Sequence, residues 1–218
     1  MNLKKQTIEV LRNFNGINQG ILFREGNVIR TMSVMRTIFA SAVVPDEFPR
    51  EFAVYDLGEF LSTVSLFENP SIQFKDEHFI IAEGNSKVKY FYSSPNVVVS
   101  PPEKKIVMPE PDVEFNLSRL QLDQLLKASA VMKLKDFAVT DSGVRVFNRN
   151  SIGNQYTIDL NMQNNGVEGF EFVIKVDNLK FIPADYAVAI SSKGLSQFKS
   201  VATKDNPELE YFVALDSE

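Results

Sequence analysis

Basic side chains at helical spacing are the residues of this chain most suited to chemistry with a partner. Lys4, Lys5 and Arg12 fall within about 100° of one another on a helical wheel, roughly opposite the apolar stripe of the same segment. Ammonium and guanidinium groups placed in this way contact DNA phosphates without reading the bases. A cationic solvent face is also the usual state of any solvated helix, so the interpretation depends on recurrence in other helices.

The same pattern recurs in the second half of the chain. Lys127 lies well away from the leucine stripe of another predicted helix, Arg119 lies beside that stripe, and Lys133 follows directly. Lys180 falls in a short predicted helix, and Lys175 just precedes it. The candidate DNA-facing residues are therefore Lys4, Lys5, Arg12, Arg119, Lys127, Lys133, Lys175 and Lys180.

The net charge of the chain limits where such a cationic surface can lie. There are 23 Lys and Arg residues against 28 Asp and Glu residues, so the net charge is −5. An acidic total argues against a protein that grips nucleic acid over most of its surface. It is compatible with a protein that is acidic outside and basic on a single face.

Residues for catalysis or metal binding are sparse. The absence of cysteine excludes disulfides, thiol nucleophiles and zinc–thiolate sites. The single histidine, His78, follows Glu77 in a predicted turn, and no glycine-rich phosphate loop is present. The acidic pair Asp46 and Glu47 falls in a predicted loop, where a solvated turn is the simpler interpretation than a magnesium site. We therefore expect no enzyme, no cofactor and no metal site; a small hydrolase that uses its carboxylates is the weakest alternative.

Four segments with helical periodicity would position the basic residues. Asp56 and Glu59 have the spacing of a capping box at the start of the second segment, and Ser118 and Gln121 have it at the start of the third. Pro183 limits the extension of the fourth. The predicted helices cover residues 3–15, 57–66, 119–131 and 178–182.

Short alternating strands rich in Val, Ile, Phe and Tyr follow each predicted helix. The predicted strands cover residues 28–34, 72–82, 87–92, 137–147, 156–162, 170–175, 186–191 and 210–215. A proline-rich stretch near the middle is predicted to be an extended connector, because proline neither donates to a sheet nor continues a helix. The pattern predicts an α+β fold of two similar domains, each made of two helix-plus-antiparallel-strand units. The expected boundaries are 1–95 for the first domain, 96–112 for the connector and 113–218 for the second domain.

Targeting and membrane segments are not expected. No stretch approaches the roughly 18 apolar residues of a membrane span. The polar residues that follow Lys4 and Lys5 do not form the apolar core of a signal peptide. We therefore expect a cytosolic protein.

Six short segments, taken in their order along the chain, resemble the sliding clamps of large tailed bacteriophages, relatives of the eukaryotic proliferating cell nuclear antigen. They are LRNF at 11–14, INQGI at 17–21, VYDLGEFL at 54–61, QLLKAS at 124–129, NLKFIP at 178–183 and YFVAL at 211–215. Each motif is weak by itself because the family has no catalytic signature. Their joint order over nearly the full length supports the resemblance.

The resemblance implies a homotrimeric ring of six DNA-clamp domains, with helices inside, sheets outside and edge strands paired between subunits. Such a ring encircles duplex DNA independently of sequence and tethers the replicative DNA polymerase, which raises processivity in the cytoplasm of the infected bacterial host. Implied partners are the C-terminal peptide of the polymerase, an ATP-dependent clamp loader and late-transcription factors. By position, Lys4, Lys5, Arg12, Lys127 and Lys180 match basic or helix-lining positions of the family.

The resemblance also implies an apolar pocket for the polymerase peptide, near the connector and the C-terminal strand. The candidate residues are Val107, Met108, Tyr211 and Val213. The alternative to a clamp is a non-enzymatic structural protein, a virion or scaffold component built of repeated α+β modules. Basic residues kept on one face favour the clamp, because a structural protein has no need of them there.

Overall fold

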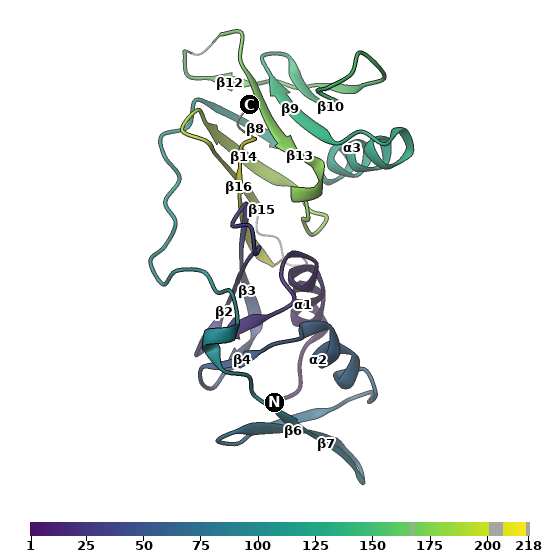
Figure 1. The fold of residues 1–218 in the computed structure, drawn as a ribbon, viewed down its shortest axis with the longest axis vertical. Helices are drawn as coiled ribbons and strands as arrows, with labels where there is room; N and C mark the ends of the chain where they lie inside the picture. The colour runs from purple at the N-terminus through teal and green to yellow at the C-terminus, as the bar shows by residue number, and fades with distance from the viewer. Residues whose placement is uncertain (167, 201–206, 217–218) are drawn as a thin grey trace. The chain divides into compact units, whose positions relative to one another are not determined.

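The computed structural model describes residues 1–166, 168–200 and 207–216. It divides into two compact units, Met1–Glu103 and Lys104–Glu218, each of which is described by itself (Figure 1). This division falls inside the predicted connector, 96–112, and the predicted domain ends at 95 and 113 stay a prediction. Both units combine helices with antiparallel strands, which confirms the predicted α+β class.

The first unit pairs its strands in three antiparallel groups. These groups are β1 with β4, β2 with β3, and the three-stranded sheet β5-β6-β7. In chain order, the elements are α1 (Lys5–Ile17), β1 (Ile21–Phe23), β2 (Gly26–Met32), β3 (Ile38–Phe48), β4 (Phe52–Val54), α2 (Leu57–Val64), β5 (Ser71–Phe74), β6 (His78–Glu83), β7 (Ser86–Phe91) and the 3-10 turn η1 (Pro95–Val97).

The second unit contains two larger antiparallel groups, β11-β10-β9-β13 and β12-β8-β14-β15-β16. Its helix α3 lies beside β10 (Figure 1) and also contacts β11. In chain order, the elements are β8 (Val113–Leu117), α3 (Arg119–Met132), β9 (Asp136–Thr140), β10 (Gly143–Phe147), β11 (Tyr156–Asp159), β12 (Gln163–Asn164), β13 (Glu171–Lys175), the 3-10 turn η2 (Val176–Asn178), β14 (Tyr186–Ser191), β15 (Leu195–Ser200) and β16 (Glu208–Ala214).

Helix α1 is held by an apolar stripe and by a carboxylate from a distant strand. Its buried residues, which include Val10, Leu11 and Phe14, recur at the three- and four-residue spacing of one helix face. The Oδ2 atom of Asp46 in β3 accepts hydrogen bonds from the Lys4 backbone N–H at 2.8 Å and from the Thr7 hydroxyl at 2.6 Å. A carboxylate at a helix N-terminus satisfies an otherwise unpaired donor and complements the helix dipole. Asp46 therefore lies buried in a strand, and its expected place in a solvated loop is wrong.

The N-caps predicted at Asp56 and Ser118 are confirmed, whereas the reciprocal capping box is formed, among the described residues, at α3 only. The Asp56 side chain accepts from the Glu59 backbone N–H at 2.8 Å. At α3 the reciprocal box is complete, with Gln121 N–H donating to the Ser118 hydroxyl and Ser118 N–H donating to the Gln121 side chain. These local motifs fix where α2 and α3 begin because the capping partners are only three residues apart.

The fourth predicted helix, 178–182, is wrong. The chain forms only the 3-10 turn Val176–Asn178 directly after β13, and an irregular segment follows. Leu179 and Phe181 point into the core at 4% and 7% exposure, and the Ile182 N–H donates to the Tyr211 hydroxyl at 3.1 Å. Core packing and a side-chain acceptor thus replace the helical hydrogen bonds, and the following proline disfavours helix at residue 182. Lys180 consequently lies on an irregular segment.

The sequence did not predict β3, the longest strand. Pro45 lies inside this strand, and proline usually argues against a ladder position. The pairing with β2 shifts between Val28, which faces Val43, and Gly26, which faces Phe48. Pro45 lies in this irregular stretch of the β2–β3 pairing.

Aromatic side chains fill both cores. In the first unit, Phe23 stacks on Phe52 with ring centroids 4.5 Å apart. In the second, Phe181 lies 4.6 Å from both Phe198 and Tyr211. In the described part of the chain, no helix is long and apolar enough to cross a membrane.

Candidate nucleic-acid interface and partner surfaces

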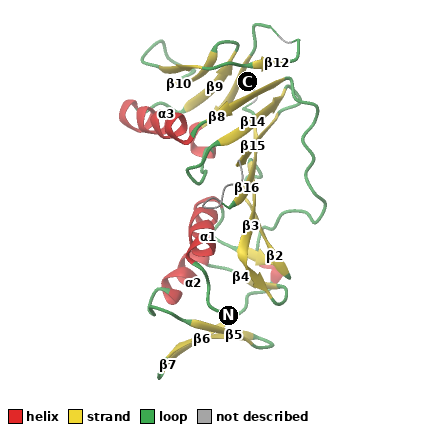
Figure 2. Ribbon diagram, turned by 180° about the vertical axis from the view of Figure 1, so that it is seen from behind, coloured by secondary structure: helices red, strands yellow, loops and turns green. Residues whose placement is uncertain are grey.

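Helices α1 and α2 lie side by side in the first unit (Figures 1 and 2). Lys5 and Arg12 are exposed on α1, while the opposite stripe is buried. Lys5 lies 3.8 Å from Glu9, and Arg12 makes no ion pair within the described residues. The Lys4 ammonium donates to the Pro45 carbonyl at 2.9 Å, which holds the side chain but leaves its charge uncompensated. The three cations therefore extend from one end of α1 and along its exposed face.

Helix α2 contributes no cation to this surface. Its sequence, LGEFLSTV, contains one charged residue, Glu59, and its cap is Asp56. The hydroxyls of Ser62 and Thr63 donate to backbone carbonyls of the same helix. The helix-bearing face of the first unit is therefore positive along α1 and acidic at the start of α2.

Helix α3 carries its cations away from the sheet. Leu122, Leu125 and Ser129 form its buried stripe, and Lys127 and Arg119 are exposed. Lys133 is the C-cap of α3, with φ of 55° in the left-handed region. A cation at a helix C-terminus is favourable, because the unpaired carbonyls there carry partial negative charge. Lys127 thus faces solvent near the middle of the helix, with Arg119 and Lys133 at its two ends.

Lys175 belongs to an ion cluster. Its ammonium lies 2.6 Å from Asp136 Oδ1 and 2.9 Å from Asp216 Oδ2. The hydrogen bond to Asp136, and then the one to Asp216, raise the pKa of Lys175. Burial raises the pKa of Asp136, but the Arg149 backbone N–H and Lys175 outweigh it and hold that pKa below its usual value. Two carboxylates therefore compensate the charge of Lys175, unlike that of exposed Lys127.

The four residues predicted to form the partner pocket occupy different environments. Val107 is 76% exposed and Met108 is half-buried in the irregular stretch before β8. Tyr211 and Val213 are 0% exposed in β16, and the Tyr211 hydroxyl accepts from Ile182. A peptide can contact Val107 directly, but it reaches Tyr211 or Val213 only if the core opens. The sequence did not predict that both side chains are buried. Three consecutive residues of β16 are buried, so this strand lacks the usual alternation of buried and exposed positions.

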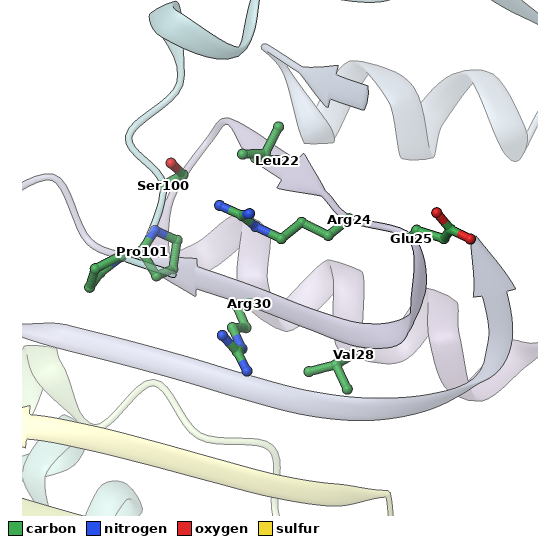
Figure 3. A pocket seen from close by; sticks show the side chains of 8 residues that line it. Leu22, Arg24, Glu25, Val28, Arg30, Ser100 and Pro101 are labelled. Carbon is green, nitrogen blue, oxygen red and sulfur yellow. The ribbon is translucent and has the colours of Figure 1, made fainter. Parts of the chain in front are cut away.

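Sequence reasoning missed a cavity of about 170 Å³ in the first unit (Figure 3). Strand β2, the turn before it and the start of the connector supply its lining, which includes Arg24, Val28, Arg30 and Pro101. The alternation of Val28 and Arg30 on an exposed strand face was its only signal in the sequence. Among the described residues, no group of three or more His, Asp or Glu side chains is arranged to hold a metal ion.

Comparison with known structures identifies the fold. The structure of A. fulgidus PCNA bound to the C-terminal region of FEN-1 superposes with a TM-score of 0.70 at 13% identity, covering 97% of this chain and 95% of that one. PCNA from Thermococcus kodakaraensis gives a TM-score of 0.70 at 13% identity, with 97% and 96% covered. The fold is therefore that of a DNA clamp of two similar domains.

Sequence comparison then gives the family. Residues 4–100 match the family described as DNA polymerase processivity factor, and residues 114–217 match the C-terminal family of the gp45 sliding clamp. The sliding clamp of Vibrio phage KVP40 is 35% identical over 100% of both chains. That of Escherichia phage RB69 is 30% identical over 100% of this chain and 98% of its own. The chain belongs to the sliding clamp family of DNA polymerase processivity factors.

Family membership confirms both the predicted resemblance and the predicted function. The chain is a sliding clamp that tethers a DNA polymerase and catalyses no reaction itself. This assignment does not favour the alternative of a virion or scaffold component. The predicted DNA-facing and pocket residues stay predictions at the level of single side chains.

Proposed function

We propose that three copies of this chain close into a ring around duplex DNA in the cytoplasm of an infected bacterium, with the helices facing the hole. The observation that carries the proposal is the placement of Lys5, Arg12 and Lys127 on the solvent faces of helices whose other faces are buried. Cations placed in this way meet phosphates and make no contact with base edges. The ring would therefore hold any sequence and remain free to slide.

Ring closure requires free strand edges that fit one another. Strand β7 is an outer edge of the sheet β5-β6-β7, and it exposes Lys87, Lys89 and Phe91. Strand β11 is an outer edge of the sheet β11-β10-β9-β13, and it exposes Thr157 and Asp159. Unpaired edges of this kind readily accept another strand. We assign the subunit interface to β7 of one copy and β11 of the next, where lysines meet an aspartate.

The opposite edge of the second sheet is less available for this pairing. The Asp216 N–H donates to the Val173 carbonyl of β13 at 2.8 Å, so the C-terminal segment occupies part of that edge. The Lys175 side chain of the same strand is bound to two carboxylates. Among the described strands of this sheet, β11 therefore offers the better edge to a neighbour.

Partners would act at the outside of the ring. The sequence contains no phosphate-binding loop, which supports a separate ATP-dependent loader as the source of energy for ring opening. Exposed Val107 and half-buried Met108 support docking of the polymerase C-terminal peptide beside the connector, with Tyr211 and Val213 in the core of the same unit. We extend the proposal to late-transcription factors, which would share this outer surface.

Topological retention tests encirclement directly. Labelled protein is loaded on nicked circular DNA with the clamp loader, the polymerase and ATP, and it is then challenged with 0.5 M salt. We expect it to remain on the circle and to leave within minutes once a restriction enzyme linearises the DNA. Equal retention on circular and linear DNA would contradict a ring, and unchanged product length on primed circles would contradict the tethering role.

A further inference from the structure

A second cavity of the first unit, of about 290 Å³, is lined by α1, by α2 and by the segment that leads from α2 into β5. Its volume is close to the lower end of the roughly 300–1,000 Å³ typical of small-molecule sites. The walls are mainly apolar and include Ile8 of α1, Leu61 and Val64 of α2, and Phe67 of the following segment. Apolar and aromatic walls of this kind suit the faces of a flat ring.

Polar residues complete the lining, and two of them carry opposite charges. Arg12 and Glu68 are both exposed, and neither has an ion-pair partner among the described residues. Asn2, Ser65 and Asn69 add neutral hydrogen-bonding groups. The cavity therefore suits a ligand that brings an anionic group for the guanidinium and N–H donors for the carboxylate.

Hydrogen bonds hold the segment after α2 in position. The Glu83 carboxylate accepts from the backbone N–H groups of Glu68 and Asn69, each at 2.9 Å. The Ile72 N–H donates to the Met1 carbonyl at 2.7 Å, which ties β5 to the segment before α1. These bonds order the lining before any ligand arrives, so binding would cost little conformational entropy.

The place of the cavity in the fold favours a nucleotide over other ligands with this pattern of charge. Helices α1 and α2 lie side by side (Figure 2), and Arg12 belongs to the exposed cationic face of α1. The proposed function places this face against DNA phosphates. A nucleotide carries a phosphate, a flat ring and, in adenine, cytosine and guanine, an exocyclic amino group that donates hydrogen bonds.

From these observations we propose that the cavity binds one deoxynucleotide unit, with its base against the apolar walls and its phosphate on Arg12. The base stacks on Phe67, and its amino group donates to Glu68. The unit is a free mononucleotide or an unpaired nucleotide of a DNA strand, and in the second case it would hold the clamp at a gap or a frayed end. The assignment rests on the proposed function only in expecting DNA along α1.

Free nucleotides test the site on the protein alone. Titration followed by saturation-transfer NMR should show saturable binding of deoxyadenosine monophosphate. Deoxyadenosine lacks the phosphate and thymidine monophosphate lacks the amino group, so each should bind about tenfold more weakly through loss of a hydrogen bond to a charged group. Absence of saturable binding at millimolar ligand, or equal affinity of these compounds, would overturn the proposal.

Two further ligands identify the source of the nucleotide and exclude another class. Tetradeoxyadenylate that binds more tightly than the mononucleotide would identify a DNA strand as the source, and weaker or equal binding would identify the free nucleotide. L-Phenylalanine carries both charges and an aromatic ring but no phosphate. Its displacement of the nucleotide at equal concentration would assign the cavity to amino acids and refute the proposal.

Variants then assign binding to the cavity. Ser65→Trp fills the lining and should abolish binding, whereas Ser62→Trp, at an exposed position of α2 outside the lining, should retain it. Arg12→Gln should remove the preference for deoxyadenosine monophosphate over deoxyadenosine, and Arg36→Gln, at an exposed arginine outside the cavity, should keep it. Equal effects within either pair would contradict the site. These measurements use neither loader nor circular DNA, so failure here is distinguishable from failure of the ring.

Discussion

At the residue scale, what surrounds each cation distinguishes the candidates better than its place in the sequence. Lys127 and Lys175 were both predicted to face DNA, yet only Lys127 keeps an uncompensated charge on an exposed helix face. Lys175 is bound to Asp136 and Asp216, which lie 39 and 41 positions away in the chain. A local sequence pattern does not indicate ion-pair partners at that separation. The sequence therefore predicted a cation at position 175 but not the two carboxylates that surround it.

Charge reversal at the two best-placed cations should weaken the hold on DNA. For the double variant Arg12→Glu and Lys127→Glu, we expect retention on nicked circles at 150 mM salt to fall at least about tenfold, because phosphate contacts are lost and repulsion is added. The dependence of retention on salt concentration should also become shallower. Lys193→Glu changes an exposed cation in the β14–β15 turn and serves as the control. Equal retention of the double variant and the wild-type protein would exclude Arg12 and Lys127 from the DNA interface.

The carboxylate that caps α1 should contribute to stability. Asp46→Ala removes the acceptor of the Lys4 N–H and of the Thr7 hydroxyl. Loss of a cap of this kind lowers the free energy of unfolding by about 1–2 kcal/mol. Urea denaturation measures it, with Glu47→Ala, an exposed neighbour in the same strand, as the control. Equal losses in the two variants would show that the cap contributes nothing.

The Asp136 and Lys175 cluster should make stability depend on pH at both extremes. Because the pKa of Asp136 is lowered by folding, its contribution is present above about pH 4 and lost as pH falls through its folded value. Because the pKa of Lys175 is raised, its contribution is present below about pH 10 and lost as pH rises through its folded value. The cluster therefore stabilises the fold between these limits.

Asp136→Asn checks the acid side of this dependence. Relative to wild type, we expect a loss of about 2 kcal/mol in urea at pH 7, because a buried charged acceptor is removed. The loss should narrow as the pH falls below 4. Asp76→Asn, at an exposed carboxylate, should show no such pH dependence. A constant difference from pH 7 down to pH 2.5 would contradict the assigned pKa shift.

At the element scale, local signals were reliable where the partners were local. Ser118 and Gln121 predicted the start of α3 because a capping box needs only three residues of separation. The helix predicted after β13 was wrong because distant contacts determine the conformation there. Phe181 is buried in the core, and the Ile182 N–H donates to the hydroxyl of Tyr211, which lies 29 residues away from Ile182 in the sequence. Strand β3 was also missed. It contains Pro45, which usually argues against a ladder position, and its pairing with β2 is irregular between Gly26 and Val28.

The proposed pairing of β7 with β11 can be tested by exchanging charges. Lys87→Glu with Lys89→Glu should raise the concentration at which the assembly dissociates, because acidic side chains would then face Asp159. Adding Asp159→Lys to the same chain should recover part of the loss. The control is Lys75→Glu, an exposed change in the β5–β6 turn. Loss without recovery would argue that the lysines act elsewhere than against β11.

At the scale of the whole molecule, the order of weak motifs predicted the family, the fold and the function. The sequence was less informative about the sites. Tyr211 and Val213, predicted to line a pocket, are buried, and no motif marks the cavity beside Arg30. Burial and cavities depend on which distant segments meet, and a single sequence does not reveal that. Family-level patterns therefore predicted more than residue-level ones.

Assembly provides the test at this scale. Sedimentation at micromolar concentration should give a species of three times the 24.6 kDa chain mass. Dilution should reveal a reversible fall toward the mass of one chain, because edge-strand interfaces are held by a limited number of backbone bonds. A single chain mass at every concentration would contradict the ring.

The outer surface of α2, which carries no cation and is acidic at its start, lies beside the cations of α1 and has a consequence for motion. In the proposed ring, positive stations would alternate with neutral or acidic gaps around the hole. A duplex would then meet several shallow, equivalent free-energy minima. Its phosphates would pass from one group of cations to the next as the duplex rotates and advances. The rate of one-dimensional diffusion would be set by the spacing of these stations, and filling the gaps with lysine would produce a tighter but slower clamp.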